Sequence, residues 1–95
     1  MRPLRDPEGA ELSHLVNACE LEGKHVLEIG CGDGKFTRQY ESLPRWVVGI
    51  DLDLSDLHEA ESNKSSLRSF FIRSKGEQLP FPAQGFDIAI FASSL

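Results

Sequence analysis

The chain has 95 residues, 40% of them hydrophobic, and a formal net charge of −5. This length suits one small globular domain over residues 1–95, and the acidic balance disfavours nonspecific nucleic-acid binding, which relies on basic patches. No apolar run approaches the roughly 20 residues that cross a membrane, and the first residues lack the apolar core of a signal peptide. With only two cysteines we expect reduced thiols in a cytoplasmic protein, and no cysteine or histidine cluster has the spacing of a metal site.

A helix is predicted to begin at Asp6-Pro7-Glu8. A capping acid, a proline in the first turn and a second acid all suit the positive end of a helix dipole. Apolar side chains then recur at helical spacing: Leu12, Leu15, Val16 and Cys19. Gly23 marks the end of this helix.

The next segment is an apolar strand that turns into a helix through a run of glycines. The strand His25-Val26-Leu27 leads through Glu28 into Gly30-Cys31-Gly32-Asp33-Gly34, and a helical stretch follows from Lys35 to Leu43. Glycine permits positive φ and lets bare backbone approach a ligand, while the helix start offers unpaired N–H groups. The run therefore predicts a ligand-binding turn. A tight turn without a ligand is the alternative, but it leaves the strand acid and the spaced glycines without an evident purpose.

The spacing of these glycines separates two kinds of nucleotide site. A dinucleotide fingerprint reads G-x-G-x-x-G, and in either register its third glycine would fall on Lys35 or Thr37. The observed spacing, Glu-x-Gly-x-Gly-x-Gly, instead resembles the first motif of the class I S-adenosylmethionine-dependent methyltransferases. A carboxylate at Glu28 is favourable opposite the ammonium and sulfonium of that cofactor.

A second acid follows at the end of the next strand. Trp46–Ile50 is β-branched, aromatic and uncharged, as expected of a buried parallel strand, and it ends at Asp51, 21 positions after Gly30. A ribose-binding carboxylate is expected about 20 residues after a glycine turn. The resemblance gives the same role to Asp51. Asp53 differs, because it precedes the helical stretch Leu54–Ala60 and is predicted to be its N-cap.

A third segment runs from Gly76 through Leu79-Pro80-Phe81-Pro82 into the strand Gly85–Phe91, after an earlier strand at Phe70-Phe71-Ile72. It is similar to the "Leu-Pro-Phe … Phe-Asp" stretch of many small-molecule methyltransferases. In that family an acid just upstream often meets the adenine amino group. The matching position here is Lys75, which has donors only, so Glu77 or the backbone of Gly76 would have to replace that contact.

The order of these elements predicts an α/β fold, a Rossmann-like parallel sheet with flanking helices. In the family that the chain resembles, the strand order is 3-2-1-4-5-7-6. The four predicted strands would form the truncated block 3-2-1-4, so we expect a domain that is incomplete at its C-terminus. Strand 4 would then be an exposed apolar edge over residues 86–91, a site for self-association or for pairing with another chain.

The resemblance implies S-adenosylmethionine as cofactor and a methyltransferase function for this cofactor-binding portion, with the methyl acceptor open and no catalytic residue assigned. The residues expected to bind the cofactor are Glu28, Gly30, Cys31, Gly32, Gly34, Asp51, Leu52, Gly76 and Glu77. Two alternatives remain: a half-domain that binds the cofactor or a partner without chemistry, and a Rossmann-like protein that binds another nucleotide.

Overall fold

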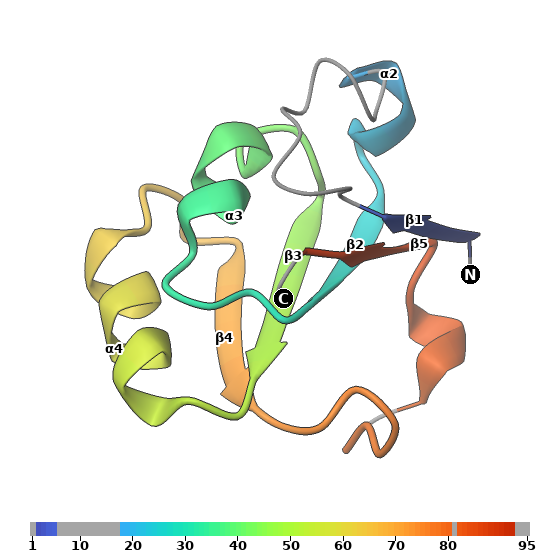
Figure 1. Ribbon diagram of the computed structural model, residues 1–95. Coiled ribbons are helices and arrows are strands. Elements are labelled where there is room, and N and C mark those ends of the chain that lie inside the picture. Colours follow the sequence, from blue (N-terminus) through green and yellow to red (C-terminus); the bar gives the residue numbers. More distant parts are fainter. Residues whose placement is uncertain (1, 6–17, 81, 93–95) are drawn as a thin grey trace.

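The computed structural model describes residues 2–5, 18–80 and 82–92 (Figure 1). Its elements, in chain order, are β1 (Arg2–Arg5), α2 (Ala18–Leu21), β2 (His25–Ile29), α3 (Lys35–Tyr40), β3 (Trp46–Asp51), α4 (Leu54–Asn63), β4 (Ser69–Arg73), a 3-10 helix (Ala83–Gly85) and β5 (Ile88–Phe91). Most of the helix predicted from Asp6 lies outside the described residues. Its end is described as α2, and Gly23 follows with a φ of 72°, as the stop signal predicts.

The strands form one sheet in the order β1-β5-β2-β3-β4, and every neighbouring pair is parallel. The predicted block 3-2-1-4 is confirmed as β4-β3-β2-β5. Because all strands run the same way, their carboxyl ends share one edge of the sheet. The register pairs Ile29 with Ile50 and Asp51 with Arg73, so the segments after β2, β3 and β4 leave the sheet side by side.

One expectation was wrong: β5 is not an edge strand. β1 pairs with it in parallel, from Arg2 opposite Ile88 to Arg5 opposite Phe91 (Figure 1). The added strand gives hydrogen-bond partners to backbone groups of β5 that would otherwise face outward. Arg2–Arg5 contains a proline and two arginines, which gave no sign of a strand, although proline and charge are tolerated on an edge. The proposed pairing of a second chain with an exposed strand at residues 86–91 loses its basis.

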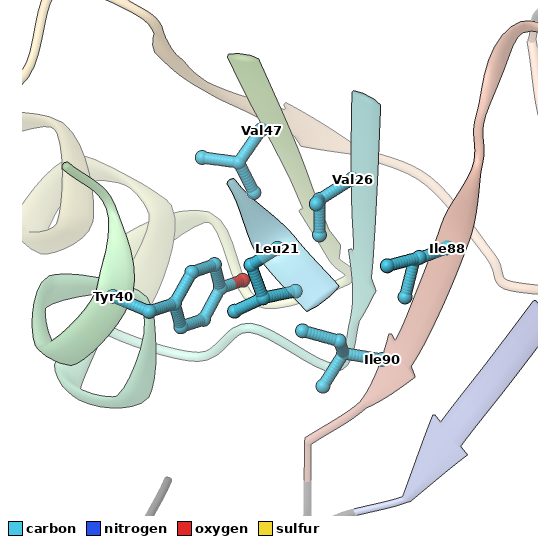
Figure 2. Packing of buried hydrophobic residues seen from close by; sticks show 6 residues of the cluster. All are labelled: Leu21, Val26, Tyr40, Val47, Ile88 and Ile90. Atoms are coloured by element: carbon cyan, nitrogen blue, oxygen red, sulfur yellow. The ribbon is translucent and has the colours of Figure 1, made fainter. Parts of the chain in front are cut away.

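The core lies on both faces of the sheet, because side chains alternate along each strand. On one face α2 and α3 pack onto the strands (Figure 2), and the buried cluster there comprises Leu21, Val26, Tyr40, Val47, Ile88 and Ile90. On the other face Leu27 and Ile50 pack with Phe86, from the segment before β5. The helix α4 lies against β3 and β4 and buries Leu57 and Ala60.

Candidate cofactor-binding site

The glycine turn joins β2 to α3 and requires left-handed backbone. Gly30, Gly32 and Gly34 have φ values of 78°, 54° and 81°, a region that other residues rarely adopt. A Cβ atom on Gly34 would also lie 3.0 Å from the Cβ of Ala60 on α4. The turn can therefore pass close to α4 only with glycine at this position.

The end of β3 holds the turn in place. The N–H groups of Gly30 and Cys31 both donate to the carbonyl of Ile50, at 2.9 and 3.0 Å. Gly49, also on β3, lies beneath Cys31, and a Cβ there would come within 2.9 Å of the Cys31 Cβ. A glycine inside a buried strand, for which the sequence offered no reason, is thus explained by the close approach of the turn.

The Asp51 carboxylate lies where the turn meets the end of β3. Its Oδ2 accepts the Gly32 N–H at 2.9 Å, and its Oδ1 accepts the Asp53 N–H at 2.9 Å. Each carboxylate oxygen has two acceptor positions, so both oxygens keep capacity for a further donor. Two backbone donors thus fix the orientation of a half-buried carboxylate at the carboxyl edge of the sheet.

A cavity of about 650 Å³ opens beside this carboxylate, a volume in the usual range for small-molecule sites. It lies at the carboxyl ends of β2, β3 and β4, where open α/β sheets bind ligands. Its lining comprises Ile29, Gly30, Ile50, Asp51, Leu52, Ser74, Lys75, Gly76, Glu77 and Gln78. The structure therefore brings five of the nine predicted residues to one cavity: Gly30, Asp51, Leu52, Gly76 and Glu77.

A tight turn after β4 forms the distal wall of the cavity. Lys75 and Gln78 make an antiparallel bridge, and the Gln78 N–H donates to the Lys75 carbonyl at 3.2 Å. The Ser74 N–H donates to the Asp51 carbonyl at 3.1 Å and so attaches this turn to β3. A Cβ on Gly76 would come within 3.0 Å of the Ile29 Cγ2. The Gly76 backbone therefore packs directly against the Ile29 side chain.

Glu28 is not among the residues that line the cavity. Its side chain is fully buried, and its Oε1 accepts the hydroxyls of Thr37 at 2.8 Å and Tyr40 at 2.5 Å, both from α3. Burial, followed by the charge of Glu28, raises the pKa of Tyr40 well above its ordinary value. The Tyr40 hydroxyl thus stays protonated and remains a donor to Glu28.

The other three predicted residues, Cys31, Gly32 and Gly34, form the turn without lining the cavity. Cys31 is buried, and burial, followed by the charges of Glu28 and Asp51, raises the pKa of its thiol far above the usual range. Its side chain packs against Gly49 and has the character of a neutral core residue. These three residues therefore belong to the turn beside the cavity and not to the cavity wall.

Five of the residues that line the cavity were not among the predicted site residues: Ile29, Ile50, Ser74, Lys75 and Gln78. Ser74 comes directly after β4, so the rule that ligands gather at the carboxyl ends of strands could have found it. Asp53, by contrast, is confirmed as the N-cap of α4, because its Oδ1 accepts the Asp56 N–H at 3.0 Å.

Acidic side chains surround this edge of the sheet. The pKa of Asp56 is raised, first by partial desolvation and then by the charges of Asp53, Asp51 and Asp33. Part of this shift comes from the neighbouring carboxylates, so these acids lie close enough to one another to interact. Carboxylates gathered at this edge favour a ligand with positive charge.

None of the helices in the described part of the chain is long and apolar enough to span a membrane. Residues 2–5, 18–80 and 82–92 contain no group of three or more His, Cys, Asp or Glu side chains arranged to hold a metal ion.

The parallel sheet, the glycine turn and the acid that ends β3 are the features expected of a Rossmann-like domain. A family model described as "Methyltransferase domain" matches residues 26–95. The chain belongs to this family, the class I S-adenosylmethionine-dependent methyltransferases.

Relatives of known name agree with this assignment. The ubiquinone biosynthesis O-methyltransferase of Burkholderia pseudomallei is 39% identical over 69 residues, which cover 67% of this chain and 30% of the relative. An S-adenosylmethionine-dependent methyltransferase from Mesorhizobium loti superposes with a TM-score of 0.69 at 27% identity, over 76% of this chain and 33% of that one. A phosphoethanolamine N-methyltransferase from Haemonchus contortus was solved with phosphoethanolamine and S-adenosylhomocysteine. It superposes with a TM-score of 0.71 at 26% identity, over 84% of this chain and 17% of that one. The chain thus spans about a third or less of the length of these relatives.

Proposed function

We propose that this chain binds S-adenosylmethionine in the cavity at the carboxyl edge of the sheet and forms the cofactor-binding portion of a methyltransferase. The observation that carries the proposal is the Asp51 carboxylate, which lies in the cavity wall with each oxygen fixed by one backbone N–H. This carboxylate can accept both hydroxyls of a ribose without reorienting. Hydrogen bonds to a charged acceptor are the strong kind.

The walls of the cavity suit the base of a nucleoside. Ile29, Ile50 and Leu52 supply apolar surface for a flat ring, and the exocyclic amine of adenine is a donor that needs an acceptor. Glu77 lines the cavity and can accept, whereas Lys75 has only donors. We therefore assign the adenine contact to Glu77 or to the backbone at Gly76.

The charge of the site suits the other end of the cofactor. With the ribose on Asp51 and the base against the turn after β4, the methionyl part extends along the glycine turn. Its ammonium and sulfonium would then lie near the carboxylates of Asp51 and Asp56, both of which approach the turn at Gly32.

S-adenosylmethionine supplies an electrophilic methyl group that a nucleophile attacks in line. The contribution of this chain's residues is to bind and orient, which lowers the entropic part of the barrier. The names of the relatives differ, from a ubiquinone biosynthesis O-methyltransferase to a phosphoethanolamine N-methyltransferase. We therefore leave the acceptor and the acceptor-binding residues of this protein open.

Calorimetric titration of the purified chain with S-adenosylmethionine, with NAD as the comparison ligand, tests the proposal. We expect saturable binding of S-adenosylmethionine and no binding of NAD. Asp51→Ala removes the ribose acceptor and should weaken binding by about 1.5–3 kcal/mol, the range for hydrogen bonds to a charged group.

Asp53→Ala is the matched control, because it removes an N-cap acid but keeps the backbone N–H that Asp51 accepts. Flat heats from a folded sample, or equal affinity in the Asp51→Ala variant, would contradict the proposal. Binding of NAD alone would favour a different nucleotide.

A further inference from the structure

The buried Glu28 carboxylate lies where the glycine turn leaves the sheet. Glu28 lies on β2, two residues before Gly30, and α3 begins at Lys35, directly after the turn. One oxygen of Glu28 accepts two hydroxyls, from Thr37 and from Tyr40. Both donors belong to α3 and both are fully buried. This group of three side chains, Glu28, Thr37 and Tyr40, is called here the Glu28 cluster.

The other polar contacts at the start of α3 go to the turn and not to the sheet: the Lys35 N–H donates to the Asp33 Oδ1 at 3.1 Å, and the Arg38 side chain donates to the Asp33 carbonyl at 2.8 Å. The helix contains only six residues, and its N-cap, Gly34, has no side chain to cap it. Tyr40 extends from α3 into the core beside β2 (Figure 2), and its ring packs edge-on against Phe36 at 5.5 Å between centroids. The apolar contacts hold α3 against the sheet, but they are not directional. The two hydrogen bonds to Glu28 give the helix its directional attachment to β2.

The glycine turn therefore has two anchors. On one side the Ile50 carbonyl and the Asp51 carboxylate accept the N–H groups of Gly30, Cys31 and Gly32. On the other side the Glu28 cluster fixes α3, to which the turn is covalently joined. The turn contains three positive-φ glycines, which give its backbone wide freedom. Each anchor restricts one end of this turn.

We infer that Tyr40 and Thr37 are positioning residues for the cofactor site: through Glu28 they hold the glycine turn in its binding conformation, without touching the ligand. The inference rests on the proposed binding of S-adenosylmethionine. It also revises the expected role of Glu28, which acts by holding the turn and not by facing the ammonium. The part of the ligand that depends on this cluster is the methionyl part, which lies along the turn.

Tyr40→Phe is the principal variant, because it removes one hydroxyl and keeps the ring in the core. Thr37→Val removes the second hydroxyl with little change of volume, and Thr37→Ser keeps it and should behave as wild type. The control for general stability is Ile88→Val, which trims the same buried cluster without touching Glu28. All four variants are compared well below their melting temperatures.

The first readout needs no ligand. Amide hydrogen exchange reports local opening of a hydrogen-bonded segment, and the N–H groups of Gly32 and Gly34 are both bonded within the turn region. We expect faster exchange at these two amides in Tyr40→Phe and Thr37→Val, relative to amides of β2. Thr37→Ser and Ile88→Val should leave this ratio unchanged.

The second readout is calorimetric affinity for S-adenosylhomocysteine and for methylthioadenosine, which lacks the amino-acid part. In Tyr40→Phe we expect S-adenosylhomocysteine to bind about tenfold more weakly, or about 1.4 kcal/mol, with a smaller loss for methylthioadenosine. In a Glu28→Gln protein, Tyr40→Phe should weaken binding less than it does in the wild type, because the two residues act through one contact.

The outcomes separate the two claims. Unchanged exchange and unchanged affinity in both Tyr40→Phe and Thr37→Val would overturn the positioning role while leaving cofactor binding intact. Equal losses in Ile88→Val would likewise overturn it, because the effect would then be general destabilisation. If the turn amides respond as expected but the wild type binds neither ligand, the proposed function fails and the anchoring of the turn stands.

Discussion

Gly34 and Gly23 offer a matched test of how tightly the glycine turn is packed. Both have left-handed backbone, with φ of 81° and 72°. A Cβ on Gly34 would meet the Ala60 Cβ at 3.0 Å and the Ala60 Cα at 3.3 Å, whereas a Cβ on Gly23 would have no neighbour within 4 Å. Gly34→Ala and Gly23→Ala therefore carry similar backbone strain and differ in the contact with α4.

The expected costs follow from these geometries. Placing an L-residue in left-handed backbone costs about 1–2 kcal/mol, and this is the whole cost expected for Gly23→Ala. Overpacking a buried contact adds about 1–3 kcal/mol, so Gly34→Ala should lose about 2–5 kcal/mol of unfolding free energy. In a domain of this size each 1 kcal/mol lowers the melting temperature by about 4–8 °C. The two variants should thus be clearly resolved.

Urea denaturation, followed by Trp46 fluorescence, measures both free energies. Adding Ala60→Gly to each variant isolates the contact, because it removes the atom that Gly34→Ala would strike. We expect Ala60→Gly to recover part of the loss in Gly34→Ala and none in Gly23→Ala. Equal destabilisation of the two single variants, or no coupling between positions 34 and 60, would refute the packing of α4 against the turn.

Two further predictions concern regions outside the cavity. Glu41 is buried and accepts hydrogen bonds from Ser65 and Ser69; although burial acts to raise its pKa, these bonds lower it below the usual 4.5. The ionised Glu41 therefore stabilises the fold fully above that pH, and this stabilisation is lost as pH falls through the lower folded pKa. Glu41→Gln should then cost about 1.5–3 kcal/mol of unfolding free energy at pH 7 and less in acid. Deleting residues 1–5 removes β1 and unpairs β5, so we expect concentration-dependent association by light scattering; a monomer at all concentrations would contradict the pairing of β1 with β5.

The local patterns of the sequence predicted most of the sheet and the frame of the site. The glycine run predicted a turn that can adopt left-handed backbone, and Gly30, Gly32 and Gly34 have positive φ values. The placement of Asp51 at the end of a buried strand also followed from its neighbours. These features were predictable because each depends on the conformation of residues adjacent in the chain.

Predictions failed where a local pattern was outweighed by distant contacts. One failure was itself local: the helical stretch was predicted to end at Ala60, but α4 continues to Asn63, where the Asn63 side chain donates to the Glu59 carbonyl and Lys64 pairs with Glu61 at 2.8 Å. The strand at Arg2–Arg5 exists because β5, far from it in the sequence, offers it an edge to pair with.

The sequence by itself determined the family, the order of the central strands and the two main features of the candidate site, the glycine turn and Asp51. Only the tertiary structure decided which way the Glu28 side chain points, which strand covers β5, and that Ser74 and Gln78 join the cavity wall. The physical reason is that backbone conformation is set by nearby residues. The partners of a buried carboxylate or of a strand edge are set by the register of the sheet, which brings distant segments together.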